Sequence, residues 1–235
     1  MLPAMDPSTF DRFADEYRQT HARNTRLSGE APEFFHEYKT IDVAARLGEA
    51  ARAPLAVLDF GCGVGNSVPF LRRHLPNATL TAADISSRSL EVARERFPGL
   101  ADYRLFDGRT LPFSDASFDV AFAACVFHHI PAADQPRLLA ELHRVVKPGG
   151  RLFLFEHNPI NPLTRHAFNT CPFDEGAEMI PAGVLTARLR TAGFADVRRE
   201  FRLFFPGPLR ALRPLERALT WLPLGAQYIA WGLRP

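Results

Sequence analysis

Apolar residues recur at helical spacing in two stretches near the start of the chain. In residues 8–21 and 33–47 they stand three or four positions apart, which is the repeat of one helix face. A glycine-containing break separates the two stretches, and Gly48 follows the second, where glycine is typical of a helix end. We therefore predict that residues 1–50 form a helical segment ahead of the main domain.

From residue 51 the pattern changes to short apolar runs that alternate with helical repeats. Such runs are typical of strands buried in a parallel sheet, and their alternation with helices indicates βαβ units with helices on both faces. The pattern predicts seven strands, at residues 55–60, 79–83, 103–106, 118–123, 151–155, 197–205 and 227–233, and helices at residues 67–74, 87–97, 132–146 and 182–192. Residues 51–235 are thus expected to form one α/β domain whose last two strands make a hairpin.

Two segments interrupt this alternation. Residues 158–180 are mixed in polarity and contain prolines, so we expect an ordered lid loop rather than a linker. Residues 206–225 form an insertion between the last two strands, in which leucines and a tryptophan are interspersed with arginines. This insertion is either an amphipathic helix that covers the sheet or a surface that touches a membrane or a lipid-like substrate.

Composition narrows the class of protein. Apolar residues make up 46% and charged residues 23% of the 235 residues, which is ordinary for a globular protein. A formal net charge of +2 is too small to indicate a nucleic-acid surface, so we expect no nucleic-acid partner. The three cysteines include no C-x-x-C pair, and the first residues do not resemble a signal peptide. We therefore expect a cytoplasmic protein, either a monomer or a homodimer.

The strongest chemical signal is the turn Leu-Asp-Phe-Gly-Cys-Gly-Val-Gly-Asn at residues 58–66. A strand, a glycine-rich turn and a helix start follow one another, which suits close approach to a nucleotide. A dinucleotide fold would place a third glycine where Asn66 stands, and no lysine follows as in a phosphate-binding P-loop. Asp59 would repel a pyrophosphate but would attract an ammonium group, so the turn favours a cationic nucleotide ligand.

Two further acids end the next two strands. Asp84 lies roughly 20 positions beyond the turn, the offset at which an acid holds ribose hydroxyls, and Ile85 can pack against an adenine. Asp107, beside Gly108, can accept a hydrogen bond from the adenine amine. Because parallel strands end at one edge of a sheet, the three acids predict one crevice for a cationic adenine nucleoside, although each acid alone could simply cap a helix.

Five stretches together resemble the class I S-adenosylmethionine-dependent methyltransferases, in the small-molecule branch that includes quinone and lipid methyltransferases. They are residues 57–65, 83–86, 105–108, 118–123 and 142–152. The resemblance implies a Rossmann-like, seven-stranded, mostly parallel sheet with helices on both faces and an antiparallel C-terminal strand. It also implies S-adenosylmethionine as cofactor, S-adenosylhomocysteine as product, and residues 1–50 as a cap over the cofactor site.

The resemblance also assigns cofactor-binding residues. The family's roles fall on Asp59, Gly61, Gly63, Asp84, Ile85, Asp107 and Gly108. We further expect cofactor contacts from Tyr17 in the cap, Cys62 in the turn and Ala123 at the end of the fourth strand.

Three histidines are the catalytic candidates. His128 and His129 follow the fourth strand and His157 follows the fifth, where each could act as a general base or orient an acceptor. They could equally serve only packing and hydrogen bonding at the strand ends. No histidine shows a metal-ligand spacing with acids or cysteines, so we expect no metal.

The sequence therefore predicts methyl transfer to a small molecule of quinone, lipid, sugar or phenolic type. The alternative is a relative that binds the same cofactor for other chemistry or for regulation. Asp59 and Asn66 disfavour a nicotinamide-dependent oxidoreductase.

Overall fold

The computed structural model describes Asp11 and residues 28–235. The helix expected at residues 8–21 lies outside the described residues except for Asp11, and so does Tyr17. The helix expected at residues 33–47 is present as α3 (Pro32–Leu47), and it ends at Gly48, whose φ is +59°.

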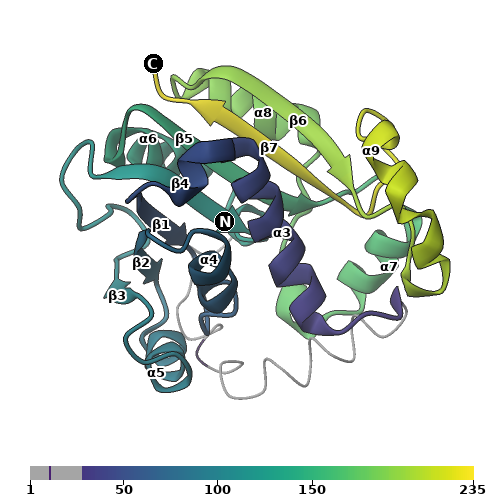
Figure 1. The fold of residues 1–235 in the computed structure, drawn as a ribbon, viewed down its shortest axis with the longest axis horizontal. Helices are drawn as coiled ribbons and strands as arrows, with labels where there is room; N and C mark the ends of the chain where they lie inside the picture. The colour runs from purple at the N-terminus through teal and green to yellow at the C-terminus, as the bar shows by residue number, and fades with distance from the viewer. Residues whose placement is uncertain (1–10, 12–27) are drawn as a thin grey trace.

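A seven-stranded sheet forms the centre of the molecule (Figure 1). Its strands are β1 (Ala56–Phe60), β2 (Thr79–Asp84), β3 (Asp102–Leu105), β4 (Phe118–Ala124), β5 (Val146–His157), β6 (Ala195–Arg202) and β7 (Gln227–Leu233), in the order β3-β2-β1-β4-β5-β7-β6. Strands β1 to β5 pair in parallel, whereas β7 runs antiparallel to both β5 and β6. The predicted fold class is confirmed, and the strand order reverses between β1 and β4, where open α/β sheets bind ligands.

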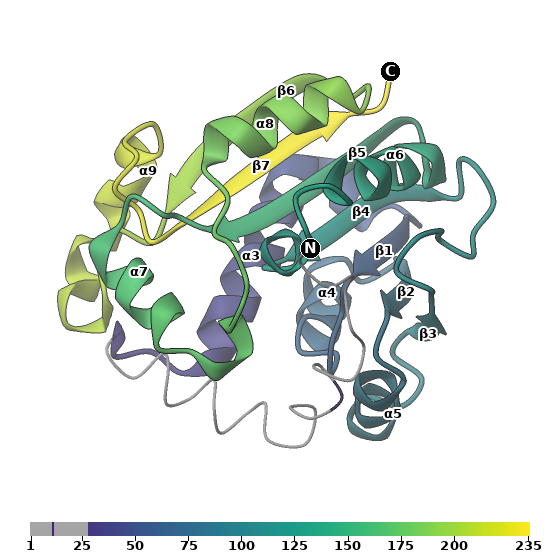
Figure 2. The same cartoon turned by 180° about the vertical axis from the view of Figure 1, so that it is seen from behind.

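Helices cover both faces of the sheet (Figures 1 and 2). On one face, α3, α4 (Val68–His74) and α5 (Ser87–Arg96) bury their apolar side chains. On the other face, α6 (Gln135–Val145) and α8 (Ala182–Thr191) do the same. The central strands are therefore buried on both sides, which explains their continuous apolar runs.

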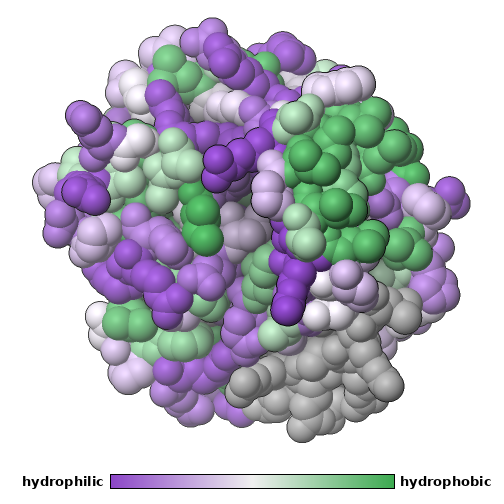
Figure 3. Space-filling view, turned by 45° about the vertical axis from the view of Figure 1, so that its right-hand side comes forward, coloured by the Kyte–Doolittle hydropathy of each residue, from purple (hydrophilic) through white to green (hydrophobic). Residues whose placement is uncertain are grey.

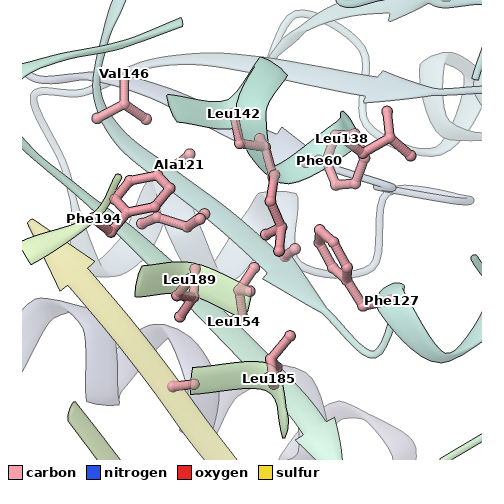
Figure 4. Close-up of a cluster of buried hydrophobic side chains, with 14 of the residues drawn as sticks. Phe60, Ala121, Phe127, Leu138, Leu142, Val146, Leu154, Leu185, Leu189 and Phe194 are labelled. Carbon is pink, nitrogen blue, oxygen red and sulfur yellow. The ribbon is translucent and has the colours of Figure 1, made fainter. Parts of the chain in front are cut away.

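Strand β5 shows how one strand serves both cores. Leu152 and Leu154 point to the α6 and α8 side, where Figure 4 shows Leu154 among Leu138, Leu142 and Leu185. Phe153 and Phe155 point to the opposite core. This alternation follows from the two-residue repeat of a strand. The strand begins at Val146, earlier than predicted, because that residue pairs with Phe118 before a register shift.

The two irregular segments lie beyond the carboxyl ends of the strands. Residues 158–180 are not a simple loop, because they contain the helix α7 (Pro162–Asn169) and the 3-10 turn η4 (Pro172–Asp174). Asn161 caps α7 by accepting the N–H of Thr164, and Pro162 occupies the first turn. An asparagine followed by a proline was a local start signal for this helix that the loop prediction missed.

The insertion at residues 206–225 folds as the 3-10 helix η5 (Gly207–Leu215) and the short helix α9 (Glu216–Leu219). It is tied to the sheet: Phe201 N–H donates to the Thr220 carbonyl at 2.7 Å, and Glu216 accepts the N–H groups of Phe204 and Phe205. Within the described part of the chain, no helix is long and apolar enough to cross a membrane.

Candidate active site

The glycine turn after β1 packs against its neighbours through its backbone. The N–H groups of Gly61 and Cys62 both donate to the Ala83 carbonyl, at 2.8 and 3.1 Å. Gly61 has a φ of +71°, and a Cβ there would lie 2.5 Å from Val126 Cγ1. Only glycine therefore fits between β1 and the loop after β4.

Asp59 ends β1 as a buried carboxylate with an exposed fraction of 3%. Its Oδ2 has no hydrogen-bond partner among the described residues. Burial, with a smaller contribution from Asp84, raises the pKa of Asp59 to about 8. A buried carboxyl oxygen that has no donor among the described residues is suited to a cationic partner brought by a ligand.

Asp84 ends β2 and anchors the turn from the other side. Its Oδ2 accepts the N–H of Gly63 at 2.7 Å, and its Oδ1 accepts the N–H of Ser86 at 2.9 Å. Burial raises the pKa of Asp84, although these hydrogen bonds act in the opposite direction. Ser86 Oγ also donates to Asp11 at 2.5 Å, which joins this strand end to the N-terminal segment.

A cavity of about 490 Å³ opens along these strand ends. Its volume lies in the range of small-molecule and cofactor sites. Among the residues predicted from the sequence, those that line it are Asp59, Gly61, Cys62, Gly63, Asp84, Ile85, His128, His129 and His157. The structure thus brings nucleotide-type residues and catalytic candidates together in one cavity.

Three other predicted residues do not line this cavity. Asp107 is exposed, and its Oδ1 accepts the N–H groups of Thr110 and Arg109, which lower its pKa. Gly108 follows it with a φ of +73°. Ala123 is packed in the apolar core between the sheet and α6. Their contacts with a cofactor stay predictions, and so does that of Tyr17.

His128 lies between two carboxylates. It belongs to the 3-10 turn η3 (Phe127–His129), and its Nδ1 is 2.6 Å from Glu156 Oε2. Its Nε2 is 3.3 Å from Asp174 Oδ1. Burial acts to lower the pKa of His128, but the two carboxylates outweigh it and raise the pKa well above the usual value. Glu156 therefore pairs with a histidine.

The other two histidines are held neutral. Burial, followed by the charge on His128, lowers the pKa of His129 to about 3 and that of His157 to about 4. His129 Nε2 is 3.6 Å from Asp174 Oδ1, and His157 Nδ1 is 3.4 Å from Gln227 Nε2. Neutral imidazoles in a cavity can orient an acceptor without adding charge.

The grouping of His128, His129 and Asp174 was not visible in the sequence. One ligand atom from each lies within 4.8 Å of the others, so the three could also hold a metal ion. However, His128 is favoured as an imidazolium between two carboxylates, and a metal needs a neutral imidazole. Without a metal ion, the two carboxylates favour the imidazolium form of His128, which suits proton transfer.

Aromatic side chains line much of the remaining cavity. They are Phe34 and Phe35 from α3, Phe168 and Phe173 from α7 and η4, and Phe204 and Phe205 after β6. These phenylalanines carry no functional signal in the sequence, because phenylalanine periodicity does not distinguish a cavity wall from a core. Their clustering favours an apolar acceptor.

The chain is similar in sequence to known proteins. The family described as a methyltransferase domain matches residues 58–154. The chain is 31% identical over 178 residues to the ubiquinone/menaquinone biosynthesis C-methyltransferase of Desulfotalea psychrophila, covering 66% of this chain and 71% of that one. It is 44% identical over 190 residues to methyltransferase GfsG of Streptomyces halstedii, covering 75% and 67%.

A solved structure shows the same fold over nearly the whole chain. It is an S-adenosylmethionine-dependent methyltransferase of Thermotoga maritima, described as a possible histamine N-methyltransferase. The TM-score is 0.69 at 21% identity, with 97% of this chain and 99% of that chain covered. On the strength of the two sequence relatives, the chain belongs to the S-adenosylmethionine-dependent methyltransferases and uses that cofactor.

Proposed function

We propose that this enzyme methylates a hydroxyl-bearing, hydrophobic small molecule and that His128 is the general base. The observation that carries this proposal is the buried set Glu156–His128–Asp174 beside an aromatic-lined cavity. A hydroxyl is a weak nucleophile until its proton is removed, so it needs such a base.

When bound, the cofactor supplies an electrophilic methyl group on a sulfonium whose sulfur leaves as a neutral thioether. His128 Nε2 takes the hydroxyl proton as the carbon–oxygen bond forms. Glu156 holds Nδ1 and so fixes the tautomer whose Nε2 carries the lone pair, and Asp174 stabilises the resulting imidazolium. His129 and His157 stay neutral and orient the acceptor.

Two segments support a covered site. Helix α3 places Phe34, Phe35 and Lys39 in the cavity wall, in keeping with residues 1–50 as a cap over the cofactor. Residues of α7 and η4, including Phe168 and Asp174, close the side next to the histidines. We propose that residues 158–180 act as the lid of the acceptor site.

The test combines a pH profile with a matched control. S-Adenosylhomocysteine release is measured with a panel of phenols, hydroquinones and hydrophobic alcohols. We expect His128→Gln to lower kcat at least about 100-fold, the usual contribution of a general base, whereas His74→Gln, on the far end of α4, should not.

The pH dependence provides a second readout. Because a raised pKa keeps His128 protonated, the rate should increase with pH as the neutral form becomes populated. Asp174→Asn removes one of the carboxylates that raise this pKa, so its rate profile should shift to lower pH. An acceptor that His128→Gln methylates at the wild-type rate would exclude His128 as the base.

An apolar surface suggests how the acceptor arrives. Two segments, residues 158–180 and 206–225, expose large apolar side chains. They are Ile160, Leu163, Leu209, Leu212, Leu215, Trp221 and Leu224. Figure 3 shows an extended apolar area on the side of the molecule that carries α7, η5 and α9. The two segments are joined where Asn161 Nδ2 donates to the Leu224 carbonyl at 2.8 Å. We call these seven residues the entrance surface.

The entrance surface borders the cavity, because Leu163 and Asn161 also line the cavity wall. We propose that a lipid-like or amphiphilic acceptor crosses this surface on its way to His128, with the exposed arginines of residues 206–225 at its edge. Leu163→Ser should raise the KM for apolar acceptors several-fold and leave S-adenosylhomocysteine binding unchanged. The control is Leu105→Ser, since Leu105 is also exposed but lies on β3; equal KM values in the two variants would contradict the proposed route.

A further inference from the structure

Lys39 is a buried cation that has no acidic partner among the described residues. It is one of only two lysines in the chain, its exposed fraction is 3%, and it lines the cavity from α3. Its Nζ donates to the Phe35 carbonyl at 2.9 Å and lies 5.3 Å from the centroid of the Tyr38 ring. Among the described residues, no carboxylate stands within ion-pair distance of this ammonium group. Buried lysines are normally paired, so Lys39 is suited to an anion that a ligand supplies.

Four uncharged polar side chains on this side of the molecule leave that role open. Its charge acts on Cys125 and His157, which places both nearby. Burial raises the pKa of Cys125 and lowers that of His157, so the thiol and the imidazole are both neutral. Tyr38 donates its hydroxyl proton to Gln227, and neither carries a charge. No group among these four neutralises the ammonium of Lys39.

The same cavity also contains an acidic group without a donor. This group is Asp59, whose buried Oδ2 has no partner among the described residues. Within the part of the chain that the structure describes, one cavity thus presents a cation on α3 that has no ion-pair partner and, on β1, a carboxyl group whose Oδ2 has no donor. A ligand end that carries both an ammonium and a carboxylate would compensate both groups at once. An aliphatic or aromatic acceptor would compensate neither.

We propose that Lys39 binds the α-carboxylate at the amino-acid end of the cofactor, while Asp59 binds its ammonium group. Lys39 retains two N–H donors beyond the bond to Phe35, enough for a charge-assisted contact with a carboxylate. Lys39 is thereby a cofactor-selectivity residue, which distinguishes the intact amino-acid end from a decarboxylated one.

The experiment is calorimetric titration with two ligands that differ only in this carboxylate. They are S-adenosylhomocysteine and its decarboxylated analogue, 5′-(3-aminopropylthio)-5′-deoxyadenosine. Wild type, Lys39→Met and Lys39→Arg are compared, with Lys147→Met as the matched control. Lys147 is the other lysine, and it pairs with Asp119 at 2.9 Å outside the cavity lining. Thermal unfolding confirms that each variant is folded.

We expect Lys39→Met to weaken S-adenosylhomocysteine binding about 10- to 100-fold, the loss of a hydrogen bond between charged groups. Binding of the decarboxylated analogue should stay at the wild-type level, and Lys39→Arg should recover part of the lost affinity. Lys147→Met should bind both ligands as wild type does.

Two results would overturn the proposal. If Lys39→Met binds S-adenosylhomocysteine as wild type does, Lys39 does not contact the cofactor's carboxylate, and an anionic acceptor becomes its candidate ligand. If the variant loses affinity equally for both ligands, the effect is structural. Neither result would affect the assignment of His128, which is tested by rate and pH profile.

Discussion

Replacing Asp59 by asparagine should make the protein more stable and a weaker cofactor binder. The folded protein raises the pKa of Asp59 from 3.8 to about 8, mainly by burial. Between these values the unfolded chain has lost this proton while the folded chain keeps it. Stability therefore falls as pH rises through this window, by up to about 1.4 kcal/mol per pH unit from this group.

Asparagine has nearly the same shape but no charge to desolvate. Near pH 4 the two proteins should be about equally stable. Between pH 5 and pH 8 the free energy of unfolding of Asp59→Asn should gain about 3–4 kcal/mol on that of wild type, because the difference grows by up to about 1.4 kcal/mol per pH unit and levels off near pH 8. Urea unfolding from pH 5 to pH 8 measures this gap. Asp102→Asn, an exposed aspartate on β3, is the control and should follow wild type.

The same substitution should weaken cofactor binding, although it stabilises the fold. Because asparagine cannot neutralise an ammonium group, the affinity for S-adenosylhomocysteine should fall about 10- to 100-fold. Binding to wild type at pH 7 should also release a proton from Asp59, seen as a dependence of the calorimetric heat on the buffer. Parallel stability profiles would refute the raised pKa, and unchanged affinity would refute the ammonium contact.

Two further substitutions test the role of the glycine-rich turn after β1 in cofactor binding and in stability. Asp84→Ala should weaken S-adenosylhomocysteine binding by about 1–3 kcal/mol, the cost of a lost hydrogen bond to a charged group; calorimetry showing wild-type affinity would exclude Asp84 from the ribose site. Gly61→Ala should destabilise the fold by more than the ~1–2 kcal/mol of its positive φ, because the new Cβ meets Val126 at 2.5 Å. Combining it with Val126→Ala should recover part of that loss in urea unfolding, and strictly additive effects would mean that the contact is not the cause.

The fold could be predicted because its signals are local. Each strand is a short apolar run, and each is followed by a helix or a turn with its own punctuation. The turn at Asp59 and Gly61 was recognisable for the same reason, since its function depends on residue types at fixed short spacing. The helix α7 was missed, although Asn161 and Pro162 supplied a start signal.

Charge pairing could not be predicted, because it depends on residues far apart in the sequence. His128 was a candidate, but its partners Glu156 and Asp174 come from β5 and η4. Lys39 belongs to a helical repeat in which nothing indicates function, and it is buried only once the chain has folded. Burial and neighbouring charge set a pKa, and both exist only in the folded chain.

The sequence by itself therefore determined the order of the elements, the sheet and the glycine turn, because these follow from apolar periodicity and local backbone geometry. The tertiary structure alone decided which charges are compensated. It left the Asp59 Oδ2 atom without a donor and Lys39 without a carboxylate partner among the described residues, in one cavity, and it placed His128 between two carboxylates. In a low-dielectric interior, these long-range choices determine where a ligand's charges and a proton are stable.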